Sequence, residues 1–369
     1  MLGRPERHFQ AIHIGGTNGK GSVAALVYSA LRQTGIRTAL YQSPHLVDVR
    51  ERMIVDDSPI SPGAFAAWTE RLRNTIEETD ASFFEATTAI AFTDFAARGA
   101  DLAVVEVGLG GRLDATNVVD PLVSAVTSVN LEHTDYLGTS LEGIAREKAG
   151  IAKAGIPFVV GEADSALAEV LVERAGELGA TPVEVPSDAA YEGVLSLAGE
   201  HQRRNAAVAE AVLAHMPEEC RPDATAIARG FRSAWLPGRF DRRGIWLFDV
   251  AHNPSATAAL IATMRRSRLA RPVHALVGLL RDKDWRTVLH MLRSEVNHLW
   301  FSVAPSAPAH RRPDLAEVAA HAHADVVVEP DFDRAFASVQ RGASTVLVTG
   351  SFHTVGDVMV RLPGFPPLG

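Results

Sequence analysis

The chain has 369 residues, 47% of them hydrophobic and 22% charged, and this length suffices for two domains with separate cores. A formal net charge of −8 argues against a nucleic-acid partner, which would need a basic face. A single cysteine excludes an internal disulfide, and no run approaches the ~18 apolar residues of a membrane helix. The first ten residues are polar, so we expect no signal peptide and a cytoplasmic protein without a membrane partner.

Short apolar runs alternate with helical patterns along the first half of the chain. This rhythm is typical of a parallel sheet covered by helices on both faces. Segment 181–200 is less regular and is expected to hold a loop or hairpin. The predicted strands are Ala11–Ile14, Thr38–Tyr41, Leu102–Val107, Ser124–Val129 and Phe158–Val160, and the predicted helices are Val23–Gln33, Pro62–Thr79, Glu85–Arg98 and Leu141–Ala149.

The same rhythm resumes after a Pro-Gly break at 237–238, which marks a linker around residues 233–241. We therefore predict an α/β protein with a larger domain over residues 1–235 and a smaller, Rossmann-like domain over residues 236–369. The strands predicted in the second domain are Trp246–Val250, Val273–Leu279, Leu299–Val303, Val326–Val328 and Val346–Thr349.

The first strand leads into a loop with four glycines and one lysine, Gly15 to Ser22, before a helical pattern begins. Glycines let the backbone approach a polyphosphate, and the helix N-terminus adds a partial positive charge. Lys20 would supply a formal charge and Ser22 a hydroxyl near a metal. The usual spacing is not met, because Ile14 and Gly21 replace a glycine and a Ser or Thr. We interpret the segment as a variant phosphate loop and the first domain as of P-loop type; the alternative is a plain glycine-rich turn.

Polar residues also follow other predicted strands, where parallel sheets bind ligands. Glu106 ends an apolar strand and precedes a glycine-rich segment, a position suited to holding Mg²⁺. The bland alternative is a surface acid at a strand end. From spacing alone, His133 is no more a metal ligand than a structural histidine.

These clusters resemble the motifs of folylpolyglutamate synthase/dihydrofolate synthase, the folate branch of the Mur ligases. The resemblance runs in order from residue 13 to about residue 359, through both predicted domains. Its motifs are Gly16–Ser22, Ser43–Leu46, Phe84–Thr88, Glu106–Asn117, His133–Asp135, Arg146–Ile151, Gly199–Asn205, Leu236–Arg239, Asp249–Pro254 and Thr349–Val355.

The resemblance implies an ATP-dependent ligase that phosphorylates a substrate carboxylate and joins it to the amine of L-glutamate. The implied cofactors are ATP and one or two Mg²⁺ ions, with a monovalent cation left open. Arg239, on the linker, would reach phosphate only on domain closure, which would shield an acyl phosphate from water. By carry-over, the ATP-binding residues are Thr17, Asn18, Gly19, Lys20, Gly21, Ser22, Asn205, Arg239 and Asp249, and the metal ligands are Ser43, Glu106, His133 and Lys148.

Lys148 differs between the two interpretations. From the residues alone it is an exposed helix lysine; from the resemblance we expect it to be N6-carboxylysine, which requires a neutral amine that can attack CO₂. The resemblance also implies that Lys20, Lys148 and His252 are catalytic residues. It assigns folate binding to Phe84, Glu85, Leu113, Asp114 and Ala115, and glutamate binding to His252 and Ser351.

Only 15 residues precede Gly16, fewer than family members commonly carry, so an N-terminal helix and a loop over the pterin are expected to be missing. This weakens the expectation of dihydropteroate use more than that of ATP chemistry. We expect a monomer that acts on dihydropteroate, on reduced folates, or on both. The alternatives are a Mur-type ligase for another carboxylate, such as a cell-wall precursor, and a non-catalytic P-loop regulator.

Overall fold

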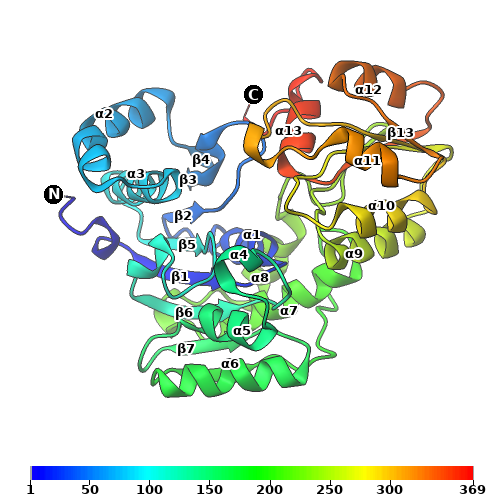
Figure 1. The fold of residues 1–369 in the computed structure, drawn as a ribbon. Coiled ribbons are helices and arrows are strands. Elements are labelled where there is room, and N and C mark those ends of the chain that lie inside the picture. The colour runs from blue at the N-terminus through cyan, green and yellow to red at the C-terminus, as the bar shows by residue number, and fades with distance from the viewer. Residues whose placement is uncertain (1, 369) are drawn as a thin grey trace. The chain divides into compact units, whose positions relative to one another are not determined.

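The computed structural model describes residues 2–368, so Met1 and Gly369, which bound the predicted domains, lie outside the described residues. The chain forms two compact units (Figure 1). The second unit includes two short segments from within the first unit's part of the sequence, which the predicted single boundary does not anticipate. Unit 1 comprises residues 1–44, 49–196 and 202–235, and unit 2 comprises residues 45–48, 197–201 and 236–369.

Within residues 2–368, unit 1 has an eight-stranded sheet in the order β4-β3-β2-β5-β1-β6-β7-β8. All neighbours pair in parallel except β2 with β3 and β3 with β4, which are antiparallel. The strands are β1 (Gln10–Gly15), β2 (Thr38–Tyr41), β3 (Met53–Val55), β4 (Ser58–Pro59), β5 (Leu102–Glu106), β6 (Pro121–Val126), β7 (Pro157–Val160) and β8 (Thr181–Glu184).

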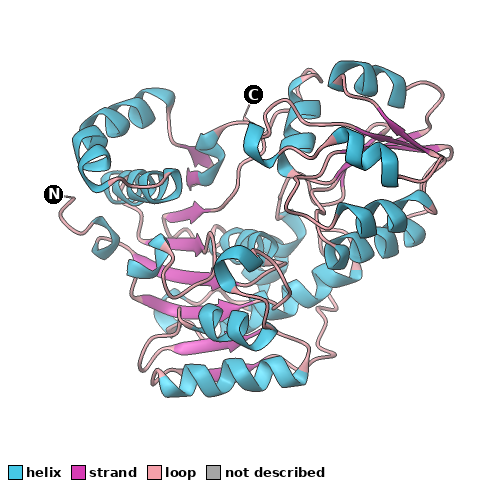
Figure 2. Ribbon diagram, in the orientation of Figure 1, coloured by secondary structure: helices cyan, strands magenta, loops and turns pink. Residues whose placement is uncertain are grey.

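Five helices described in unit 1 begin at a Ser or Asp whose side chain accepts a backbone N–H bond. Ser61 and Ser82 accept backbone N–H bonds at the starts of α2 and α3. In Figure 2, α5 and α6 lie in front of the strands. The helices are α1 (Lys20–Leu31), α2 (Pro62–Thr79), α3 (Phe83–Ala97), α4 (Thr134–Leu137), α5 (Leu141–Ala149), α6 (Ser165–Glu177), α7 (Glu200–Ala214) and α8 (Ala224–Ser233), with short 3-10 turns at Pro5–Arg7, Val49–Arg52, Ala115–Val118 and Glu218–Cys220.

Unit 2 is a smaller α/β body with the strand order β13-β12-β11-β14-β10-β9. In its described part, up to residue 368, β9 is antiparallel to β10 and the other neighbours are parallel. Its strands are β9 (Asp241–Arg243), β10 (Trp246–Phe248), β11 (Val273–Val277), β12 (His298–Phe301), β13 (Val326–Val328) and β14 (Thr345–Thr349). Its helices are α9 (Pro254–Arg266), α10 (Trp285–Arg293), α11 (Leu315–His321), α12 (Phe332–Val339) and α13 (Phe352–Val360), with a 3-10 turn at Ala309–Arg311.

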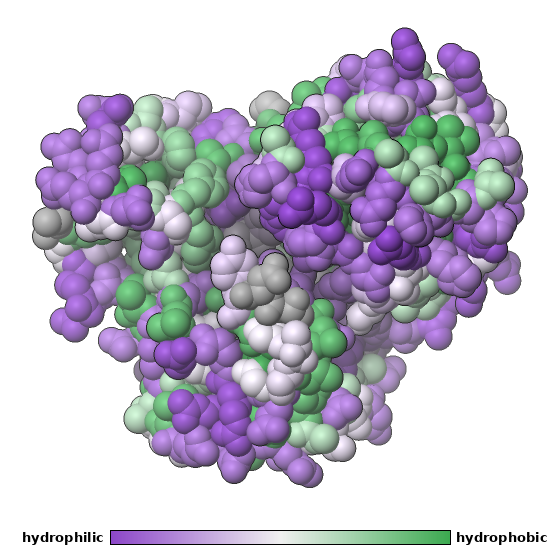
Figure 3. Space-filling view, in the orientation of Figure 1, coloured by the Kyte–Doolittle hydropathy of each residue, from purple (hydrophilic) through white to green (hydrophobic). Residues whose placement is uncertain are grey.

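Each unit has its own apolar core. In unit 1, one cluster fills the space between the sheet and α3, and another lies between β6, β7 and the helices α5 and α6. Unit 2 has a cluster on each side of its sheet. Hydrophilic residues cover most of the face seen in Figure 3, with smaller apolar groups between them. Of the helices described, none combines the length and the apolar character needed to cross a membrane.

The predicted α/β class is confirmed, and several elements differ from prediction in their limits. The strand predicted at Ser124–Val129 is wrong by three residues, because β6 ends at Val126 and Thr127 turns to hydrogen-bond the loop after β1. Helix α1 starts at Lys20 rather than at Val23. Strands β3, β4, β8 and β9 were not predicted as strands.

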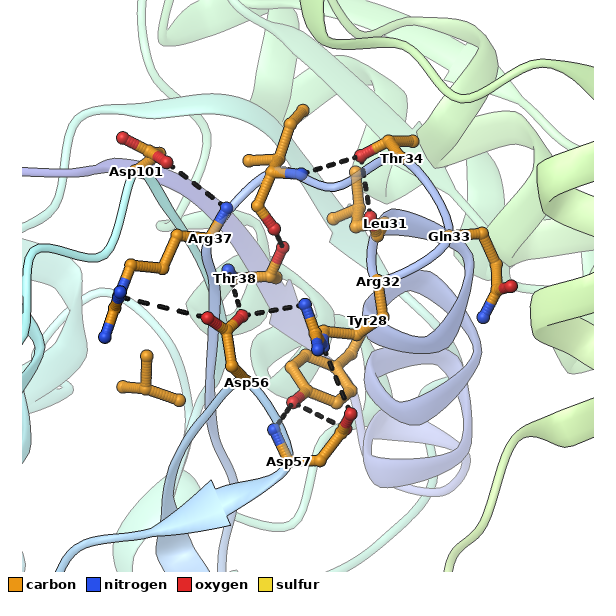
Figure 4. Close-up of polar contacts among 12 residues, drawn as sticks. Tyr28, Leu31, Arg32, Gln33, Thr34, Arg37, Thr38, Asp56, Asp57 and Asp101 are labelled. Carbon is orange, nitrogen blue, oxygen red and sulfur yellow. Dashed lines mark hydrogen bonds and ion pairs between the residues drawn. The ribbon is translucent and has the colours of Figure 1, made fainter.

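The β3–β4 hairpin is held to α1 by a group of polar contacts (Figure 4). Tyr28 Oη donates to Asp57 Oδ1 at 2.9 Å and accepts from Asp57 N at 2.7 Å. Arg32 pairs with Asp56 at 2.8 Å and with Asp57 at 3.2 Å. Both aspartates have positive φ, at 51° and 63°, so the contacts also hold an uncommon turn. The hairpin is thereby tied to the helix that begins at the glycine-rich loop.

Candidate active site

Three loops of unit 1 leave the sheet at one edge. Strands β1 and β5 are parallel neighbours with Ile14 beside Glu106, and Val107 N donates to Ile14 O at 2.9 Å. Strand β2 pairs with the other side of β5, with Tyr41 beside Val105. The loops after β1, β2 and β5 therefore start next to one another, at the edge where parallel sheets bind ligands. We call residues 107–117 the β5 loop.

The loop after β1 requires glycine at two positions. Gly16 has φ +139°, and a Cβ there would overlap the Thr127 hydroxyl. Gly19 has φ +90°, and a Cβ there would lie 2.6 Å from Asn205 Oδ1. Lys20 Nζ donates to Gly16 O at 3.0 Å and to Thr17 O at 3.1 Å, which keeps the ammonium group over the loop. Asn205, which is predicted to bind the nucleotide, therefore lies beside the loop although it is far from it in sequence.

The segment after β6 fixes the course of this loop. Asn18 N donates to Ser128 Oγ at 3.0 Å, and Asn18 O accepts from Thr127 Oγ1 at 2.7 Å. Thr17 N donates to Ser128 O at 2.7 Å, and Thr17 Oγ1 accepts from Asn130 N at 3.0 Å. Hydrogen bonds to the segment after β6 therefore hold both sides of the loop.

Ser43 and Glu106, both predicted to be metal ligands, are in contact. Glu106 is buried at 4% exposure, and its Oε2 accepts from Ser43 N at 3.2 Å. A carboxylate and a hydroxyl are oxygen ligands of the kind that Mg²⁺ prefers. Between residues 2 and 368, no three His, Cys, Asp or Glu side chains are grouped as a ready-made metal site. Mg²⁺ commonly keeps several waters and takes few protein ligands, so the residue types of this pair suit such an ion.

His133 lies in the loop before α4, with φ +52°. Its Nε2 is 3.9 Å from Glu132 Oε1, and the residue is exposed. A left-handed histidine on an exposed loop is uncommon and worth attention. Its role as a third metal ligand stays a prediction.

Lys148, on α5, has the electrostatics that carbamylation needs. The residue is buried at 4% exposure. Burial, and then the nearby positive charge of Lys20, lower its pKa to about 7, while Glu132 acts in the opposite direction. A large share of the amine is therefore neutral near pH 7, and the neutral amine is the form that attacks CO₂. The bland alternative of an exposed helix lysine is wrong.

The predicted folate residues of α3 have different surroundings. The Phe84 ring packs directly against Gly108 at the start of the β5 loop, where a Cβ would overlap the ring. Its ring centroid is 6.1 Å from that of Tyr41. Glu85 is exposed, and its Oε2 accepts from Ser82 N at 2.8 Å and from Ser82 Oγ at 2.7 Å. Glu85 thus completes the N-cap of α3. Contact of either residue with folate stays a prediction.

The remaining predicted folate residues lie in the β5 loop. Leu113 is 78% exposed, and Ala115 begins the 3-10 turn that follows. Asp114 caps that turn: Oδ1 accepts from Thr116 N at 3.0 Å, and Oδ2 accepts from Leu109 N at 2.8 Å. Burial raises the pKa of Asp114, and these hydrogen bonds act against the rise. The carboxylate organises the loop, and its second lone pairs are what it can offer a ligand.

Unit 2 carries its own polar cluster after β10. Asp249 accepts from Phe240 N and from Ala251 N, each at 2.9 Å. Burial raises the pKa of Asp249, and the Arg239 guanidinium acts in the opposite direction. Arg239 also lies over the Phe352 ring, 5.1 Å from its centroid. The cluster brings together Arg239 and Asp249, the two predicted nucleotide residues of this unit.

The predicted glutamate residues lie near the same segment of unit 2. His252 Nδ1 is 2.9 Å from Val250 O, which can only accept, so Nδ1 carries a proton and Nε2 holds the lone pair of the neutral ring. The His252 ring centroid is 6.4 Å from that of Phe352. Ser351 caps α13 by accepting from Thr354 N at 3.1 Å. Both residues are therefore held in fixed orientations.

Sequence reasoning did not assign three residues that the structure places in these clusters. Arg52 is buried beside Phe83, 5.3 Å from the ring centroid. Burial lowers the pKa of its guanidinium, and Tyr41, Glu106 and Glu51 act in the opposite direction. His201 lies near Arg239, and its pKa is lowered to about 4 by desolvation and by that charge. Phe352 underlies Arg239. His201 and Phe352 lie in motifs quoted above, but nothing in those motifs indicates that they meet Arg239.

Two sequence families match the chain. Residues 14–213 match the Mur ligase middle domain, and residues 238–352 match the Mur ligase glutamate ligase domain. A Bacillus subtilis dihydrofolate synthase/folylpolyglutamate synthase is 30% identical over 98% of this chain and 92% of its own length. The Escherichia coli protein of the same name is 36% identical over 94% of this chain and 85% of its own.

A Halobacterium salinarum protein, described as a probable bifunctional folylpolyglutamate synthase/dihydropteroate synthase, is 37% identical over 95% of this chain. The chain spans 46% of that relative's length, so about half of it has no counterpart here. Among solved structures, E. coli FolC in complex with DHPP and ADP has a TM-score of 0.86 at 32% identity, covering 98% of this chain and 91% of that one. A bifunctional folylpolyglutamate synthase/dihydrofolate synthase with Mn, AMPPNP and L-glutamate bound has a TM-score of 0.82 at 30% identity, covering 98% and 93%.

Proposed function

Because the chain belongs to the dihydrofolate synthase/folylpolyglutamate synthase family of Mur ligases, we propose that it uses ATP to join L-glutamate to a pteroate or folate carboxyl group. One observation carries the proposal. The phosphate loop, Ser43 and the β5 loop leave neighbouring strands at one edge of the sheet, with Ile14 beside Glu106. The residues proposed to bind the nucleotide, the metal ion and the acceptor would then all lie at the same edge of the sheet, as phosphoryl transfer between bound groups requires.

The proposed chemistry has two steps. A carboxylate oxygen of the acceptor attacks the γ-phosphorus of ATP, the bond to the bridging oxygen breaks, and ADP leaves. The amine of glutamate then attacks the acyl carbon, phosphate leaves, and the nitrogen loses a proton as the amide forms. Phosphoryl transfer needs positioning and charge neutralisation more than covalent assistance. The residues that bind and orient the reactants are therefore expected to contribute most to the rate.

Residues of unit 1 would bind ATP and orient the acceptor. Lys20 and the glycine loop would hold the phosphates, with Asn205 beside Gly19. Mg²⁺, when bound, would neutralise phosphate charge; Ser43 and Glu106 fit it, and His133 and carbamylated Lys148 are proposed with them. The β5 loop and Phe84 would hold the flat acceptor. In this unit, ATP is also proposed to contact Thr17, Asn18, Gly19, Gly21 and Ser22.

Residues of unit 2 would hold glutamate and contribute to nucleotide binding. His252 and Ser351 are proposed for glutamate, and Arg239 with Asp249 for ATP. The His252 ring is held through Nδ1, which lies 2.9 Å from Val250 O. A His252→Gln variant tests whether His252 takes part in turnover, for example by removing a proton. It should lose turnover while its affinity for ATP stays unchanged.

We further propose a monomer in the cytoplasm with small-molecule partners only. A net charge of −8 and a single cysteine in 369 residues support this placement.

The test measures ADP release by the purified protein with ATP, Mg²⁺ and glutamate. ADP should form only when dihydropteroate or a reduced folate is added, and each acceptor is supplied alone. Release with a cell-wall precursor and with neither pterin compound would instead favour a Mur-type ligase for another carboxylate. ATP binding without turnover on any acceptor would favour a regulator. Lys20→Ala and Glu106→Ala are matched controls, since either should abolish turnover on both acceptors.

A further inference from the structure

The β5 loop lies directly against the last turn of α5, with no side chain between the two backbones. A Cβ at Gly111 would lie 2.7 Å from Lys148 O and 2.8 Å from Glu147 O. A Cβ at Gly150 would lie 2.8 Å from Arg112 Cα and would overlap its side chain. Glycine at both positions lets the two segments approach this closely. Hydrogen bonds between the two backbones can therefore help to set their relative register.

Asn117 supplies the side chain that joins the two segments. Its Nδ2 donates to Arg112 O at 3.0 Å, within the loop, and to Gly150 O at 3.2 Å, at the end of α5. The amide thus uses one N–H on each segment. Lys153 Nζ donates to Asn117 O at 2.9 Å and holds the backbone of this residue from the other side.

Two further contacts run between the same segments. Arg112 N donates to Glu147 O at 3.1 Å, and Arg112 Nε donates to Glu147 Oε2 at 3.0 Å. The ion pair is partly exposed, with Arg112 at 52%, so it contributes little by itself. Among these contacts, Asn117 is the one side chain that bonds both backbones.

We propose that Asn117 is a positioning residue that keeps the acceptor-binding turn of the β5 loop in register with Lys148. This inference rests on the proposed function for its meaning. The loop carries Leu113, Asp114 and Ala115, proposed for the acceptor, and the α5 turn carries Lys148, proposed for the metal side. Asn117 touches neither substrate; it acts through the two backbones that it joins.

The test compares Asn117→Asp with the wild-type protein. Aspartate has the same shape but lacks both N–H donors and places negative charge against two carbonyl oxygens. Loss of two hydrogen bonds predicts acceptor binding weaker by about tenfold. The dissociation constant of ADP should stay within about twofold, because the phosphate loop is bonded to the segment after β6 instead. Val118→Ala, at a 52% exposed neighbour, is the control and should change neither constant.

Two measurements decide the outcome. Titration calorimetry gives the dissociation constants of dihydropteroate, of a reduced folate and of ADP. Hydrogen–deuterium exchange, which needs no ligand, follows peptides covering 108–117 and 147–150. The inference requires that both peptides lose protection together in Asn117→Asp while the peptide of α1 does not.

An unchanged acceptor constant, an equal rise for ADP, or loss of protection in only one of the two peptides would overturn the inference. If wild-type protein binds no acceptor, the proposed function fails, and the exchange result alone then supports or overturns the structural role of Asn117. Asn117→Ala serves if Asn117→Asp does not fold; it removes the same two donors without adding a charge and should also weaken acceptor binding by about tenfold.

Discussion

Gly19→Ala tests the proposed phosphate loop most directly. Gly19 has φ +90°, a conformation that costs a residue with a Cβ roughly 1–2 kcal/mol. The new Cβ would also lie 2.6 Å from Asn205 Oδ1, and Asn205 is held by Gln202, whose Oε1 accepts from its Nδ2 at 2.9 Å. Forcing an atom into such a site adds about 1–3 kcal/mol. The loop or Asn205 must shift, so AMPPNP binding should weaken by at least about tenfold, equivalent to 1.4 kcal/mol.

Gly35→Ala is the matched control. Gly35 has φ +83°, and no atom lies within 4 Å of the position its Cβ would take. It therefore carries the same backbone cost without the contact. Calorimetric titration with AMPPNP and thermal unfolding of both variants separate the two effects. If Gly19→Ala binds AMPPNP as tightly as Gly35→Ala does, the placement of Asn205 against the loop is refuted. Adding Asn205→Ala to Gly19→Ala should relieve the steric part of the unfolding cost.

Three other predictions use different parts of unit 1. With ¹³C-bicarbonate, a carbamate NMR signal should grow from about pH 6 to pH 8, because the neutral amine of Lys148 forms around its pKa of about 7, and Lys148→Met should show none; a signal that is flat with pH would contradict this. Burial lowers the pKa of His13 to about 3, so the folded protein loses stability as pH falls from 6.5 to 3, by about 4 kcal/mol at pH 3. In His13→Gln, the free energy of unfolding in urea should depend less on pH over that range. An unchanged pH dependence would rule out His13 as its cause. Tyr28→Phe should cost about 1–2 kcal/mol of unfolding free energy by removing both Asp57 bonds, with AMPPNP affinity as in wild type; a loss of affinity would mean that the hairpin also shapes the loop.

Much of the fold follows from the sequence because buried parallel strands are short apolar runs. Thr38–Tyr41 and Val326–Val328 have the predicted limits, as do α2 and α5. The β3–β4 hairpin escapes prediction because its strands are three and two residues long. Its turn is Asp56-Asp57, with no glycine to mark the positive φ values.

The site was predictable in its residue types and less so in its contacts. The glycine loop and Glu106 follow from residues at the ends of neighbouring strands, whereas Ser43 is predicted as a ligand only through the family resemblance. Lys148 could not be placed as buried from its own helix, because its neighbours in sequence are charged or small. Glu85 was read through the family motif, whereas Ser82 three residues earlier signals the capping box that it completes. The position of Arg52 near Glu106 and Phe83 could not be predicted, since both are distant from it in sequence.

The composition of unit 2 has a practical consequence for dissecting the protein. Leu46 belongs to an apolar cluster of unit 2, and Leu197 begins the other inserted segment of that unit. A Cβ at Gly356 would overlap Leu46 O, so the short segment fits closely against α13. A protein that ends at Trp235 would carry both segments away from the body in which they pack. Limited proteolysis between residues 233 and 241 should therefore yield fragments that stay associated or unfold, rather than two halves that can be purified and studied separately.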